Sequence, residues 1–215
     1  MSPAVEWGYT LGMSPDADPR RSLEQARILK EKGEYPQAVC LLEEMLTEDP
    51  GSAVVLEEIA ENEWCLGHVR RALLAARRTL ALHAESAMGH FILGLVALHE
   101  REFGRAVESL QYANRFQPDT PDILRSLGWA LFHQGETMQG VVTLERALNL
   151  EDANTNTLCD LGEVYLMLRC IPKARSLFLR ALDVDPENSR AREGIAHAEQ
   201  QEHASQGAVA CSAIV

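Results

Sequence analysis

The 215-residue sequence lacks several features that mark particular classes of protein. It carries only 20 Lys and Arg residues against 32 Asp and Glu, and its net charge of −12 argues against nucleic acid as a partner, because nucleic-acid binders need a basic face. No apolar run reaches the roughly 18 residues that a membrane span requires. The first residues lack a basic segment followed by an apolar core, so we expect no signal peptide. Together these absences predict a cytoplasmic protein without a membrane span.

Paired cysteines and enzyme motifs are also missing. The five cysteines show no regular spacing, which is typical of thiols in a reducing compartment rather than of a disulfide framework or a zinc site. A phosphate-binding glycine loop, a nucleophile elbow and a helical His-Glu metalloprotease pair are all absent. We therefore expect no enzymatic activity, no cofactor and no bound metal.

The sequence does contain an amphipathic helix pair over residues 121–154. Leu124, Leu127 and Leu131 lie at helical spacing, which predicts one apolar face. Gly135 ends this helix, and a second apolar stripe follows on the next one. Neither helix could bury its stripe alone, whereas a stack of such pairs could.

The same pattern recurs every 34 residues, in five units that keep phase without an insertion. The units begin at Pro19, Ala53, Ala87, Pro121 and Thr155. Two positions hold only Ala or Gly, because helix backbones approach closely where side chains are small. These residues are Ala26, Ala60, Gly94, Gly128 and Gly162 at position eight, and Ala38, Ala72, Ala106, Gly140 and Ala174 at position twenty.

The chain resembles the tetratricopeptide repeat (TPR) family. The resemblance rests on the 34-residue period, on Leu-Gly at positions seven and eight, on Ala at position twenty and on Pro at position thirty-two. Arg101 and Arg169 depart from the pattern by replacing the glycine between the helices, and Asp152 replaces a proline. The resemblance implies an all-α fold, a right-handed α-solenoid of five helix-turn-helix units with a C-terminal capping helix. The expected boundaries are a flexible tail over 1–18, repeats over 19–52, 53–86, 87–120, 121–154 and 155–188, a capping helix over 189–205 and a disordered tail over 206–215.

In TPR proteins the first helix of each repeat lines a concave groove, through positions two, five, nine, twelve and thirteen. Transferred to this sequence, the resemblance implies a peptide-binding groove made of Arg27, Lys30, Glu61, Trp64, Met88, Phe91, Leu95, Leu98, His99, Arg125, Trp129, Phe132, His133, Glu163, Leu166 and Met167. The first repeat is charged, whereas aromatic residues, Leu and Met dominate from Trp64 onward. Apolar residues outside the stacking stripe are typical of a binding surface.

The residues of this groove favour an apolar partner. TPR relatives that bind the charged tails of heat-shock chaperones use Lys, Asn or Arg at places that here hold Leu23, Arg27, Met88 and Ile92. An apolar groove instead fits an amphipathic helix or an extended apolar peptide. We therefore predict a non-enzymatic interaction module, either an adaptor or a secretion-chaperone-like protein. We expect its basic first repeat to take an acidic end of the partner.

A second hypothesis is a self-assembling scaffold. The aromatic residues Trp7 and Tyr9 stand in the tail, and the groove of one copy would receive the tail of the next to form a homo-oligomer. In a related arrangement, the tail would occupy the groove of its own chain until a partner competes.

Two polar features carry simpler expectations. Repeat two sets an acidic first helix, with Glu57, Glu58, Glu61 and Glu63, against a basic second helix, and we expect a solvated surface with modest pairing. His99 and His133 share position thirteen of successive repeats. We expect two polar groove residues that lie near each other, in preference to a metal site or a pH-sensing pair.

Overall fold

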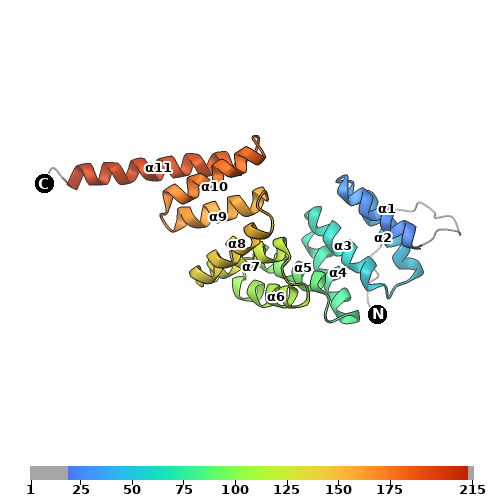
Figure 1. Cartoon of the computed structure of the whole chain (residues 1–215). Coiled ribbons are helices and arrows are strands. Elements are labelled where there is room, and N and C mark those ends of the chain that lie inside the picture. Colours follow the sequence, from blue (N-terminus) through green and yellow to red (C-terminus); the bar gives the residue numbers. More distant parts are fainter. Residues whose placement is uncertain (1–18, 213–215) are drawn as a thin grey trace. The chain divides into compact units, whose positions relative to one another are not determined.

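The computed structural model of the protein describes residues 19–212, with side chains described up to His203. Every described element is a helix, and no strand occurs within residues 19–212 (Figure 1). The tail predicted over 1–18 and the last three residues of the tail predicted over 206–215 lie outside the described residues, whereas residues 206–212 belong to the final helix.

The helices form five consecutive pairs, one pair in each sequence repeat. The pairs are α1 (Pro19–Glu31) with α2 (Tyr35–Glu48), α3 (Ala53–Cys65) with α4 (Val69–Leu82), α5 (Ala87–His99) with α6 (Phe103–Phe116), α7 (Pro121–Gln134) with α8 (Thr137–Leu150), and α9 (Thr155–Met167) with α10 (Ile171–Val184). Each first helix begins at the first residue of a 34-residue unit. The final helix, α11 (Ser189–Ser212), continues past residue 205, where the capping helix was expected to end.

The turns within the pairs share a left-handed residue at position fifteen. Gly33, Gly67 and Gly135 adopt φ angles of 75°, 74° and 103° there. Arg101 and Arg169 keep the same turn with φ angles of 60°, although a side chain disfavours that conformation. The two departures from the glycine pattern therefore preserve the helix pair and store a small local strain.

The chain divides into two compact units, which comprise residues up to Val96 and residues from Ala97 onward. The core of the first unit is built around Leu42, Leu56 and Ile92, all at most 1% exposed. That of the second is built around Leu158 and Phe178, both fully buried. In each unit the apolar stripes of successive helices meet, which is how a repeat that cannot bury its own stripe becomes stable.

Positions eight and twenty face each other within a pair, and the α3–α4 and α7–α8 pairs, one in each unit, fill them differently. In the first unit, Ala60 of α3 and Ala72 of α4 are fully buried there. In the second, Gly128 of α7 and Gly140 of α8 leave no room for a methyl group: a Cβ on Gly140 would lie 2.7 Å from the backbone nitrogen of Phe132. The absence of a side chain thus lets α7 and α8 approach closely.

Candidate functional site

In the first unit, ion pairs join the first helices of successive repeats. Lys30 Nζ donates to Glu58 Oε2 at 2.9 Å and to Glu61 Oε2 at 2.8 Å. Arg27 Nε donates to Glu58 Oε1 at 2.7 Å. Burial acts to raise the pKa of Glu58, but hydrogen bonds from Lys30 and Arg27 outweigh it, so the pKa is lowered. The expectation that these cations hold an acidic end of a partner needs correction, because the glutamates of α3 already neutralise them.

A similar chain of ion pairs joins α7, α9 and α11 in the second unit. Arg125 Nη1 donates to Asp160 Oδ2 at 2.9 Å, and Arg190 Nη2 donates to Asp160 Oδ1 at 2.7 Å and to Glu163 Oε1 at 2.8 Å. The pKa of Arg190 is raised, because its hydrogen bonds and the nearby negative charges outweigh burial. Arg125 and Glu163 were both predicted as groove residues. Each is already paired within the chain, Arg125 with Asp160 and Glu163 with Arg190. Arg190 was not predicted as a site residue. The sequence did contain a signal for it, because continuing the 34-residue count places Arg190 at position two of a sixth unit, and position two is one of the groove positions.

Aromatic side chains surround His133 near the end of α7, and we call Phe103, Trp129, Phe132 and His133 the His133 cluster. The imidazole stacks on Phe103 of α6, with ring centroids 5.0 Å apart and an interplanar angle of 18°. It meets Trp129 at 4.5 Å and Phe132 at 5.4 Å, both edge to face. Three of the four residues were predicted, whereas Phe103 comes from a second helix and was missed.

The environment of His133 keeps its imidazole neutral. Burial lowers the pKa of His133, the positive charge of Arg101 lowers it further, and Glu163 opposes the shift only in part. The Nε2 atom is buried yet has no hydrogen-bond partner among the described residues. Buried polar atoms are normally paired, so a partner atom remains to be supplied here.

Trp129 and Phe132 combine attachment to the core with exposure. Both rings pack against the core cluster of the second unit and stay half-buried. Large aromatic side chains anchored in this way contribute most to the binding energy of protein interfaces. The His133 cluster therefore presents two half-exposed aromatic rings to which an apolar side chain can bind, next to a buried nitrogen that lacks a hydrogen-bond partner among the described residues.

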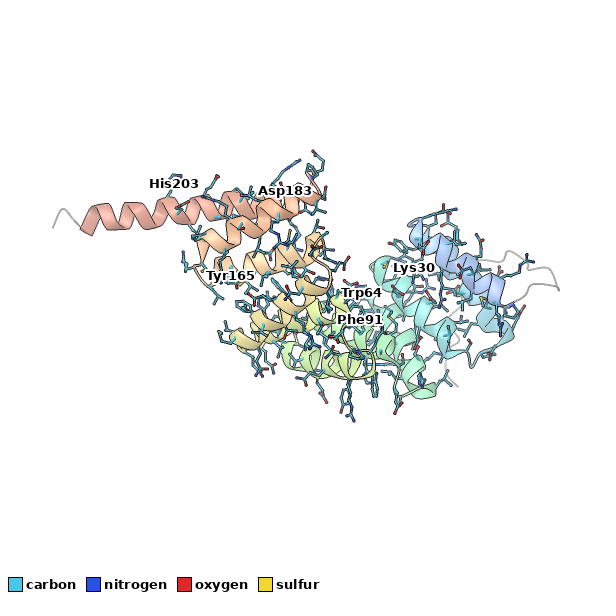
Figure 2. All side chains as sticks on the ribbon, in the orientation of Figure 1. Lys30, Trp64, Phe91, Tyr165, Asp183 and His203 are labelled. Atoms are coloured by element: carbon cyan, nitrogen blue, oxygen red, sulfur yellow. The ribbon has the colours of Figure 1, made fainter. Side chains whose placement is uncertain are left out.

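The other predicted residues fall into three groups. In the first unit, Trp64, Met88 and Leu95 are half-buried against the core, and Phe91 is half-buried as well; Figure 2 labels Trp64 on α3 and Phe91 on α5. In the second unit, Leu98 is half-buried, and His99 and Met167 are exposed. Leu166 corrects the predicted set: it is only 6% exposed and packs inside the core, so it offers almost no surface.

The acidic helix of repeat two is less solvated than expected. Glu63 is fully buried and Glu58 is 9% exposed, so both acids belong to the interior of the first unit. The sequence contained a signal for Glu63, because position eleven is apolar or aromatic in every other repeat. The residues at that position are Leu29, Ala97, Leu131 and Tyr165.

Two kinds of feature are absent from the described residues. No group of three or more His, Cys, Asp or Glu side chains within residues 19–203 is arranged to hold a metal ion. None of the helices in the described part of the chain combines the length and the apolar character needed to cross a membrane. That His99 and His133 lie near each other stays a prediction.

Comparison with known proteins agrees with the repeated helix pairs. Residues 58–119 match the sequence model of the tetratricopeptide repeat. The fold is similar to that of TTC0263, a thermophilic TPR protein of Thermus thermophilus, with a TM-score of 0.71 and 24% identity over 85% of this chain and 100% of that one.

Two further solved structures share this fold. PilF of Pseudomonas aeruginosa has a TM-score of 0.67 and 17% identity over 85% of this chain and 89% of its own. YrrB, reported as a TPR protein with an unusual peptide-binding site, has a TM-score of 0.58 and 16% identity over 82% of this chain and 91% of its own. At these identities the likeness shows the fold.

Proposed function

We propose that this chain, which is a tetratricopeptide repeat protein, is a non-enzymatic interaction module that binds an amphipathic helix of a partner protein at the His133 cluster. The observation that carries the proposal is the combination of two half-exposed aromatic rings, Trp129 and Phe132, with the Nε2 of His133, which has no hydrogen-bond partner within residues 19–203. Such a site buries an apolar anchor and pairs one polar atom of the ligand. The reported peptide-binding site of YrrB supports peptide binding by this fold.

The charge of the chain favours a basic helix as the partner. The net charge is −12, so the protein as a whole attracts cations. The predicted groove cations Arg27, Lys30 and Arg125 are already held by Glu58, Glu61 and Asp160. An amphipathic helix with Leu or Phe on one face and Lys on the other therefore complements both the His133 cluster and the long-range field. This is the behaviour of a cytoplasmic adaptor, or of a chaperone that shields such a segment.

The test uses a designed probe, because the partner is unidentified. A fluorescein-labelled helix of about five turns, with Leu and Phe on one face and Lys on the other, is titrated with the full chain and followed by anisotropy. We expect Trp129→Ala to weaken binding by about tenfold or more, as truncation of a buried aromatic anchor does. Met138→Ala is the matched control, because Met138 is 75% exposed on α8, outside the His133 cluster.

Two results would contradict the proposal. One is equal binding of the designed helix and of a scrambled peptide with the same composition. The other is equal affinity of the wild type and the Trp129→Ala variant. Light scattering on the full chain tests the self-assembly hypothesis separately: an oligomer that Trp129→Ala converts to a monomer would make this surface a contact between copies.

A further inference from the structure

A second polar site lies in the first unit, where α2, α3 and α4 meet. We call Glu43, Glu63, His68 and Arg71 the Glu63 junction. Arg71 Nη2 lies 2.6 Å from Glu43 Oε1 and 2.9 Å from Glu63 Oε1, so one guanidinium nitrogen stands between two carboxylates. The Nδ1 atom of His68 lies 2.7 Å from the other carboxylate oxygen of Glu63.

One oxygen in this junction is incompletely bonded. Glu63 is fully buried, and its Oε1, although it forms an ion pair with Arg71 Nη2 at 2.9 Å, accepts no hydrogen bond from the described residues. A buried carboxylate oxygen without a donor is uncommon, since buried charges are normally both paired and hydrogen-bonded. The atom therefore calls for a further N–H or O–H group.

Glu63 also lines a pocket of about 590 Å³, a size typical of small-ligand sites. Its apolar wall comes from Pro36, Val39, Leu41 and Leu66. Its polar lining has three carboxylates, those of Glu63 and the two neighbouring glutamates of α2, against one guanidinium and one imidazole. The pocket thus combines an apolar wall with an excess of negative charge.

We infer that this pocket binds an alkylammonium group, carried either by a free aliphatic amine or by a lysine side chain. An ammonium has three N–H donors, so it can bond to the carboxylates that line the pocket and offset the surplus negative charge around the buried Glu63. Its methylene stem lies against Val39 and Leu66, as lysine stems do on apolar surfaces. A carboxylate ligand would meet repulsion from three glutamates, and a neutral alcohol would leave the charge uncompensated. The site shares no residue with the His133 cluster, so either proposal can fail without the other.

The second unit provides the design of a test variant. At the corresponding place between α8, α9 and α10, Tyr165 stands where Glu63 stands in the first unit, beside Glu145 and Lys173. The Tyr165 hydroxyl donates to Glu145 Oε1 at 2.8 Å. Glu63→Tyr therefore installs a side chain that the repeat already accommodates, and it removes the incompletely bonded oxygen.

The experiment is an isothermal titration of the full chain with hexylamine hydrochloride at constant ionic strength. Hexanol and hexanoate, which share the hydrocarbon stem, are the matched controls. We expect saturable binding of hexylamine alone, about tenfold weaker or worse in Glu63→Tyr. Glu44→Gln, on a half-buried residue at the rim, serves as a second variant in case Glu63→Tyr does not fold, and we expect a smaller loss there. Trp129→Ala is expected to leave hexylamine binding unchanged.

A second titration distinguishes a lysine side chain from a free amine as the natural source of the ammonium. It uses the peptide acetyl-Leu-Lys-Leu-amide, with acetyl-Leu-Gln-Leu-amide as its uncharged control. Tighter binding of the lysine peptide than of hexylamine assigns the site to a lysine side chain, and weaker binding assigns it to a free amine. Equal heats for hexylamine and hexanol would overturn the inference. Unchanged hexylamine affinity in a Glu63→Tyr variant with native helical content would also overturn it. If that variant does not fold, unchanged hexylamine affinity in Glu44→Gln, together with equal binding of the two peptides, would do the same.

Discussion

The Glu63 junction and its counterpart in the second unit occupy the same positions of the repeat and solve the same packing problem differently. In both, a glutamate at position twenty-five of one repeat faces a cation at position nineteen of the next: Glu43 with Arg71, and Glu145 with Lys173. In the second unit, Tyr165 contacts both, with its hydroxyl bonded to Glu145 and Lys173 Nζ 4.8 Å from the centroid of its ring. In the first, Glu63 places a full negative charge there instead.

This difference shows how one position changes the character of a junction. Burial raises the pKa of Tyr165, and the hydrogen bond to Glu145 raises it further, so the phenol stays neutral. In the first unit, burial raises the pKa of Glu43, which Arg71 opposes and Glu63 reinforces. A neutral ring lets the junction pack without a buried charge, whereas a buried carboxylate makes it depend on a cation; a pocket borders both junctions, of about 380 Å³ beside Tyr165 and about 590 Å³ beside Glu63.

The largest expected effect comes from removing that cation. Arg71→Met leaves Glu63 buried with only His68 beside it, and we expect a loss of about 3 kcal/mol in the free energy of unfolding, the usual cost of an uncompensated buried charge. Tyr165→Phe, which removes one hydrogen bond in the second unit, should cost about 1 kcal/mol. Urea unfolding monitored by circular dichroism measures both. Equal losses would mean that the two junctions do not differ in kind.

The facing pairs at positions eight and twenty offer a second contrast. Gly140→Ala brings a methyl group within 2.7 Å of the Phe132 backbone, and we expect a loss of about 2 kcal/mol, because overpacking forces the helices apart. The reverse change, Ala72→Gly in the first unit, should cost about 1 kcal/mol through helix propensity. Thermal unfolding compares the two variants. A tolerated methyl at Gly140 would show that α7 and α8 have room to separate.

We expect the stability contributed by His133 in the second unit and by Glu43 in the first to change in opposite directions with pH. His133 has a lowered pKa in the folded state, so the stability it contributes is full above its ordinary value of 6.5 and is lost as the pH falls below that value. Glu43 has a raised pKa, so its contribution is full below its ordinary value of 4.5 and is lost as the pH rises above it.

His133→Gln should therefore flatten the urea midpoint between about pH 5 and 7, and Glu43→Gln should flatten it above about pH 4.5. If His133→Gln leaves the slope in that window intact, the imidazole does not titrate as its surroundings imply.

The smallest effect concerns the turns. Arg169 adopts a φ of 60° where Gly67 adopts 74° in the first unit. Arg169→Gly should stabilise the chain by about 0.5–1 kcal/mol, because glycine adopts this conformation without the steric cost of a side chain. Gly67→Ala should destabilise it by a similar amount. Differential scanning calorimetry resolves both shifts, and a stabilising Gly67→Ala would contradict the account.

The repeat pattern predicted the helix pairs because helix period, small residues and turns are local properties of the sequence. It did not predict the burial of Glu63, since an acid in a helix is usually solvated and only the geometry of three helices shows that its carboxylate finds Arg71 and His68. Contacts between successive first helices, such as Arg27 with Glu58, depend on which side chains meet across a repeat. Leu166 was assigned to the groove by position, but the core of the second unit covers it.

The most direct test of the proposed function uses Trp129 as its own reporter. Trp7→Phe and Trp64→Phe together leave Trp129 as the only indole of the chain. On titration with the designed amphipathic helix, we predict a saturable blue shift of its emission, since an apolar anchor covers a half-exposed ring, with the same midpoint as the anisotropy curve. Binding by anisotropy with no change in Trp129 emission would contradict the account and place the partner elsewhere on the protein.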